Sequence, residues 1–144
     1  MNKPKKHVVL MVPVGGEPYR MKIEGHYRAW QRAIGDRYFT SVAVGPGISI
    51  VCDEDYHGIE DQPNGCGLYG PYFFVKMGSD GDPRSLTKPE LEKCRRYWQA
   101  RRYDAPPKPG GSHRVLTAGT EEFEEFLRMC RIEAEAKRKF WESI

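Results

Sequence analysis

The fold of this chain is decided by residues 8–51, which read VVLMVPVGGEPYRMKIEGHYRAWQRAIGDRYFTSVAVGPGISIV. The stretch opens with a continuous apolar run, residues 8–12, of the kind that forms a strand buried on both faces. Turn residues follow from Val14 to Pro18. Beyond the turn, apolar and charged residues alternate from Tyr19 to Glu24 at the period of a half-buried strand. These features together predict a hairpin.

The second half of the stretch predicts one helix and a second hairpin. Apolar residues recur at helical spacing over residues 27–34, and Gly35 stands where a C-terminal cap is expected. Two runs rich in β-forming residues, 38–44 and 48–52, are separated by a Gly-Pro-Gly turn. The order strand, strand, helix, strand, strand predicts an α+β fold.

The chain up to residue 103 extends this unit by a strand, residues 72–75, and a helix, residues 87–102. The helix opens with a capping box, because Thr87 can cap it and Glu90 follows three residues later. We therefore expect an antiparallel or mixed sheet of about five strands, covered by the 27–34 and 87–102 helices.

The chain divides into three segments on composition. Residues 1–103 form the α+β core, residues 104–119 are a linker rich in proline and glycine, and residues 120–144 form an amphipathic helix. The first turns of that helix are acidic and its late turns are basic, which complements a helix dipole. At ~1.5 Å per residue it would be about 34 Å long, so packing on a second subunit as a homodimer stays open.

Composition limits the class of protein. The chain has 144 residues, 30% of them charged, and a formal net charge of +3, which excludes a strongly disordered or strongly nucleic-acid-like composition. Its four cysteines are too few and too widely spaced for a disulfide framework, so we expect a reducing cytoplasm. The apolar run at residues 8–14 is too short to span a membrane, so no membrane partner is expected.

The sequence contains no established catalytic constellation and predicts a non-enzymatic protein. Cys52 and His57 are close in sequence, but Cys52 ends an apolar strand and is better explained as a small core residue. The acids Asp53, Glu54 and Asp55 point to alternate faces of an extended chain, and no pair of Cys or His residues has zinc-site spacing. No metal and no cofactor are predicted.

The best small-ligand candidate is the long connection at residues 53–70. Asn64, Tyr69 and Tyr72 place a polar group beside aromatic rings, which is what a nucleotide-like ligand requires. Gly15 and Gly16 are also candidate ligand-binding residues, because their backbone N–H groups could bind a phosphate. A tight hairpin turn would explain the two glycines equally well.

Two alternatives use other parts of the chain. A nucleic-acid-binding module would combine phosphate neutralisation with base stacking on one basic face, in a chain that is nearly neutral where such binders are usually markedly basic. A host-protein inhibitor would lay the C-terminal helix in a groove of its partner. The residues of the basic face are Arg95, Arg96, Arg101, Arg102 and Tyr103.

Residues 8–97 also resemble a family of small phage- and plasmid-borne proteins known as domain-of-unknown-function family 3846. The similarity rests on the PVGGEP turn at 13–18, AWQRAIG at 29–35, ISIVCDE at 48–54, QPN at 62–64, GPYFFV at 70–75 and SLT at 85–87. The chain departs from that pattern at Gly65, where a basic residue often follows the asparagine.

The resemblance implies a mobile-element origin and a location in the host bacterial cytoplasm, and it carries no catalytic residues. The leading hypothesis is an accessory protein that binds and neutralises a host component. A nucleotide-type defence signal is the candidate ligand, which would make the protein an anti-defence factor.

Overall fold

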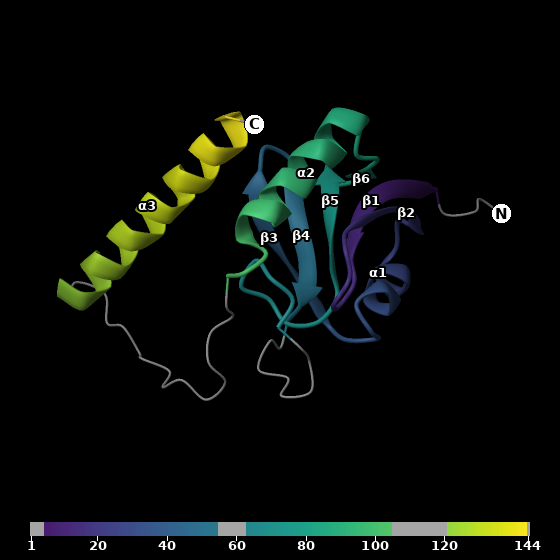
Figure 1. The fold of residues 1–144 in the computed structure, drawn as a ribbon, viewed down its shortest axis with the longest axis horizontal. Helices are drawn as coiled ribbons and strands as arrows, with labels where there is room; N and C mark the ends of the chain where they lie inside the picture. The colour runs from purple at the N-terminus through teal and green to yellow at the C-terminus, as the bar shows by residue number, and fades with distance from the viewer. Residues whose placement is uncertain (1–4, 55–62, 105–120, 144) are drawn as a thin grey trace.

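The computed structural model describes residues 5–54, 63–104 and 121–143, and it confirms the α+β class (Figure 1). Within these residues the chain forms six strands and three helices. In chain order they are β1 (Lys6–Val12), β2 (Tyr19–Glu24), α1 (Tyr27–Ala33), β3 (Phe39–Gly45), β4 (Ile48–Asp53), β5 (Tyr72–Met77), β6 (Pro83–Arg84), α2 (Lys88–Arg101) and α3 (Glu121–Ser143).

All strand pairs are antiparallel, and the strands are ordered β2-β1-β5-β4-β3 across the sheet. Both predicted hairpins are present, β1 with β2 and β3 with β4. The short strand β6 pairs with Lys76 and Met77 of β5, beyond the part of β5 that pairs with β1. A strand of two residues has no periodicity from which the sequence could predict it.

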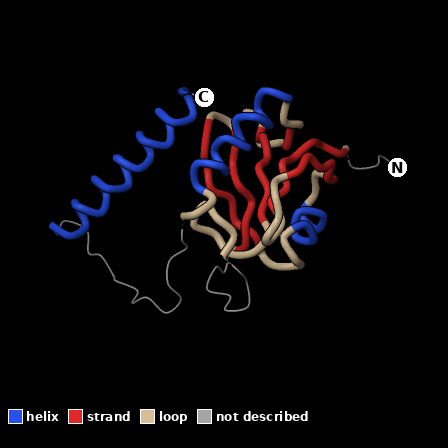
Figure 2. Tube along the Cα trace, viewed as in Figure 1, coloured by secondary structure: helices blue, strands red, loops and turns tan. Residues whose placement is uncertain are grey.

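Helices cover both faces of the sheet (Figure 2). Successive side chains of a strand point to opposite faces, so Val9 and Met11 of β1 join the cluster beneath α1, while Val8 and Leu10 join the one beneath α2. The three inner strands are buried on both faces for this reason. The predicted covering by two helices is confirmed.

Both predicted caps, Gly35 after α1 and the Thr87–Glu90 box at α2, are present, and His26 is a further cap that was not predicted. His26 caps α1 by accepting a hydrogen bond from the Ala29 backbone N–H at 3.2 Å, and Gly35 follows the helix with a positive φ of 89°. Thr87 and Glu90 form the expected capping box of α2. Local sequence signals therefore set both boundaries.

The last turn of α3 belongs to the core. Trp141 is only 4% exposed and belongs to the core cluster between the sheet and α2. Its ring centroid lies 6.3 Å from that of Tyr97 in α2. Toward its N-terminal end the helix diverges from the sheet (Figure 1). No helix in the described part of the chain has the length and apolar character needed to cross a membrane.

Candidate functional site

A turn at residues 63–70 docks against the C-terminal end of α2 and shapes the surface on both sides of it. The backbone N–H of Cys66 donates to the Arg101 carbonyl at 2.8 Å, and that of Gly67 donates to the Asp104 carbonyl at 3.2 Å. Gly65 has a φ of +84°, and a Cβ there would lie 2.8 Å from the Arg102 carbonyl oxygen. A side chain at residue 65 is therefore excluded by the close approach of two backbones.

The same turn is anchored to the sheet by Asn64. Its side-chain amide donates to the carbonyls of Val12 at 3.2 Å and Gly70 at 2.9 Å, and the backbone carbonyl of Asn64 accepts from the Tyr72 hydroxyl at 2.9 Å. Tyr72 is fully buried, and burial raises the pKa of its hydroxyl far above the usual range. Tyr69 is buried as well. Tyr69 and Tyr72 therefore lie within the protein, and Asn64 is half-buried and holds the turn against the sheet.

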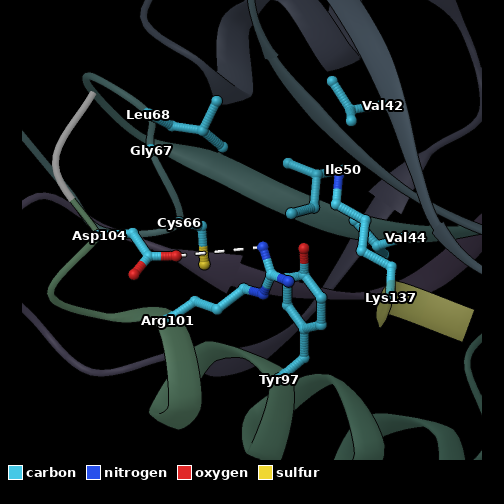
Figure 3. Close-up of a pocket in the computed structure, with 10 residues that line it drawn as sticks. All are labelled: Val42, Val44, Ile50, Cys66, Gly67, Leu68, Tyr97, Arg101, Asp104 and Lys137. Carbon is cyan, nitrogen blue, oxygen red and sulfur yellow. Dashed lines mark ion pairs between the residues drawn. The ribbon is translucent and has the colours of Figure 1, made fainter. Parts of the chain in front are cut away.

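A pocket of about 390 Å³ opens beside this turn, between the sheet, α2 and α3 (Figure 3). Aliphatic side chains of β3 and β4 form its floor, the 63–70 turn forms one wall, and charged side chains come from α2, from the residues that follow it and from α3. Its lining residues are Val42, Val44, Ile50, Cys66, Gly67, Leu68, Tyr97, Arg101, Asp104 and Lys137.

The charged groups of this pocket are two cations and one acid. The Arg101 guanidinium lies over the Tyr97 ring, 5.1 Å from its centroid, and its Nη1 is 4.0 Å from Oδ2 of Asp104 (Figure 3). Lys137 reaches the pocket from α3. An apolar floor, an aromatic ring and two cationic side chains at the edge suit an anionic ligand with a ring-shaped or apolar body.

A second hollow of about 280 Å³ lies on the other side of the turn. It brings Gly15, Gly16 and Asn64 of the predicted ligand set together with Arg102 and Tyr103 of the predicted nucleic-acid set. The Arg102 guanidinium lies over two rings, 4.7 Å from the centroid of Trp98 and 5.0 Å from that of Tyr103. Glu17 also lines this hollow, so one acid and one guanidinium contribute to it.

The predicted basic face is divided among several surroundings. Arg95 donates to the Pro18 carbonyl at 3.0 Å, and Arg96 pairs with Glu92 at 3.3 Å on the exposed side of α2. Arg101 lines the first pocket and Arg102 the second hollow. Arg95 and Arg102 thus both lie beside the 15–18 turn, whereas Arg96 and Arg101 have other surroundings.

The described cysteines behave as packing residues. Burial raises the pKa of Cys52 to about 11, with a smaller contribution from the neighbouring Asp53, and burial also raises those of Cys66 to about 11 and Cys94 to about 12. Their thiols stay protonated near neutral pH and are weak nucleophiles. His57 lies outside the described residues. Among the residues described, no group of three His, Cys, Asp or Glu side chains is placed to hold a metal ion.

Sequence reasoning missed the larger pocket because its lining comes from four separate segments. One local signal was available, since Tyr97 and Arg101 are four residues apart on a helix and so are expected to be neighbours. Nothing local could have added Lys137, which is placed by the docking of Trp141.

Comparison with protein families, curated proteins and solved structures found no match to this chain. The resemblance of residues 8–97 to family 3846 accordingly stays a proposal.

Proposed function

We propose that this chain binds and sequesters a small anionic ligand of nucleotide type in the pocket between the sheet, α2 and α3. The observation that carries the proposal is the placement of Arg101, stacked over Tyr97, and of Lys137 around an apolar floor. Anionic groups of the ligand would pair with the two cations, and its ring would cover the aliphatic floor formed by Val42, Val44 and Ile50.

The chemistry of the lining supports binding rather than bond-making. Arginine and lysine side chains act as hydrogen-bond donors and carry positive charge at neutral pH. Cys66 is the thiol in the wall, and burial raises its pKa to about 11, so it stays protonated. Asp104 faces the Arg101 guanidinium at 4.0 Å and so partly balances its charge.

The biological setting comes from the resemblance of residues 8–97 to phage- and plasmid-borne proteins. It supports an accessory protein carried by a mobile element and working in the host bacterial cytoplasm. Sequestration of a nucleotide-type defence signal would then protect the element, and the binding would need no turnover.

The direct experiment is to incubate the purified chain with extracts of bacteria whose nucleotide-signalling defence is active. The recovered protein is then denatured, and the released small molecules are identified by mass spectrometry. Release of an intact nucleotide supports the proposal. Release of a chemically altered nucleotide points to an enzyme, and a recovered protein with no bound nucleotide contradicts sequestration.

Binding should depend on Arg101 and not on its neighbour Arg96. We expect Arg101→Ala to weaken the affinity for the released nucleotide by about 10- to 100-fold, as measured by calorimetry. A loss of this size corresponds to one or two charged hydrogen bonds. Arg96→Ala is the matched control, because Arg96 lies on the same helix, is exposed and pairs with Glu92 away from the pocket. Loss of binding in Arg102→Ala but not in Arg101→Ala would place the ligand in the second hollow.

A further inference from the structure

We propose that a second copy of this chain packs against α3 as an antiparallel helix pair. The surface concerned is the outer stripe of α3, which we define as Glu125, Met129, Ile132, Ala136 and Lys139. All five side chains are exposed, and Met129 and Ile132 are each 61% exposed. Exposed apolar side chains of this size at consecutive stripe positions are the pattern of a helix face made for a partner.

The outer stripe faces away from the rest of the protein. Ile132 precedes Trp141 by nine residues, which is 2.5 turns of an α-helix, so the two side chains lie on opposite sides of α3. Trp141 is the residue that docks α3 on the core. A partner helix on the outer stripe therefore meets no part of the sheet or of α2.

The spacing of the stripe is that of a coiled-coil seam. Its members are separated by four, three, four and three residues, which keeps them on one side of a supercoiled helix. Ile132 is the midpoint of Glu121–Ser143, so a two-fold axis at Ile132 lets the two copies of α3 overlap along their whole length. Such an isologous contact closes on itself as a dimer.

Charge complementarity selects the antiparallel orientation. Glu125 lies seven residues before Ile132 and Lys139 lies seven residues after it, so the two-fold axis sets each Glu125 against the partner's Lys139. The same axis sets Met129 close to the partner's Ala136 and Ile132 against itself. A parallel pair would instead oppose glutamate to glutamate and lysine to lysine, which is unfavourable.

Charged residues beside the outer stripe are also paired by the two-fold axis at Ile132. Arg128 lies four residues before Ile132 and Glu135 three residues after it, so each Arg128 would face the partner's Glu135. Within one copy these residues form exposed pairs, Arg128 with Glu125 and Glu135 with Arg138. Exposed ion pairs contribute little to stability, so these side chains can form pairs with the partner copy instead. The interface has only three apolar positions per copy, so the expected dimer is weak and reversible.

The test is the molecular mass of the full chain over a range of concentrations, measured by sedimentation velocity. We expect the mass to rise from 16.6 kDa toward twice that value as the concentration increases. Glu125→Lys and Lys139→Glu should each weaken association about tenfold or more, because each turns two attractive contacts into repulsive ones. An equimolar mixture of these two variants should associate again, since opposite charges then meet at both ends.

Two further variants separate this interface from other effects. Ile132→Lys should give a monomer with unchanged helix content by circular dichroism. Glu124→Lys makes the same charge change one residue outside the stripe and should leave association unchanged. A chain that stays monomeric at every concentration overturns the proposal, as does association that survives Ile132→Lys or a mixture that associates no better than its parts.

Discussion

Trp141 lies so close to Gly45 that a Cβ at residue 45 would be 2.5 Å from the indole ring. The last turn of α3 therefore docks where β3 has no side chain. This contact also places Lys137, one turn earlier in α3, at the edge of the pocket. The position of the C-terminal helix and the charge of the candidate site thus depend on one glycine.

Replacing either partner should destabilise the protein, and the two effects should not add. Trp141→Ala removes a buried aromatic side chain and is expected to lower the free energy of unfolding by about 3 kcal/mol. Gly45→Ala forces the indole away and should cost about 1–3 kcal/mol through overpacking. In the double variant the second substitution should cost little, which urea denaturation of all four proteins would show.

Gly25→Ala is the matched control for this cycle, because the nearest atom to its added Cβ would be 3.5 Å away, an ordinary contact. Strict additivity of Gly45→Ala and Trp141→Ala would mean that the two residues are not in contact in solution.

Asn64 is expected to be a structural residue. Asn64→Ala removes the donors to the carbonyls of Val12 and Gly70 and should lower the free energy of unfolding by about 1–3 kcal/mol. Asn64→Asp keeps the shape of the side chain but places a carboxylate against both carbonyl oxygens. It should therefore lower the free energy of unfolding more than Asn64→Ala does. If Asn64→Ala instead kept full stability and lost ligand affinity, the side chain would be a ligand contact.

The stability of the α2 N-terminus should depend on pH through Glu90. Partial burial raises the pKa of its carboxyl, but hydrogen bonds from Thr87 and Lys76 outweigh this, and the net pKa lies below the ordinary 4.5. A lowered folded pKa means that the contribution is complete above pH 4.5 and is lost as the pH falls through the folded value. Glu90→Gln should therefore flatten the loss of stability in acid.

This prediction is measured as the urea midpoint of the two proteins from pH 7 to pH 3. Glu92→Gln serves as the control on the same helix, since the pair that Glu92 forms with Arg96 is exposed. An equal acid loss in wild type and Glu90→Gln would contradict the role given to Glu90.

Nucleic-acid binding by the residue 95–103 segment should be absent or weak, because its arginines face different surroundings. We expect no appreciable fluorescence anisotropy change with mixed-sequence single-stranded DNA or RNA at low salt. Tight binding that falls steeply as salt increases, and that is reduced by Arg102→Ala and Tyr103→Ala, would favour the nucleic-acid alternative.

The sequence by itself determined the secondary structure and the fold class. The apolar run of β1, the alternation in β2, the helical spacing around Trp30 and the capping box at Thr87 are signals between near neighbours. Such signals report the local backbone conformation, because the period of the buried side chains follows from strand or helix geometry. The hairpins were also predictable, since their strands are joined by short turns.

Only the tertiary structure decided what those elements bring together. Leu10 pairs with Phe74 across the centre of the sheet, and Trp141 reaches Gly45 from the far end of the chain. Neither contact leaves a mark on the sequence around its members, because packing between distant segments depends on shape and volume rather than on local period. The same reason explains why Asn64 binds the Val12 and Gly70 carbonyls while it also lines the second hollow. It also explains why Arg101 and Arg102, adjacent in sequence, line two different hollows.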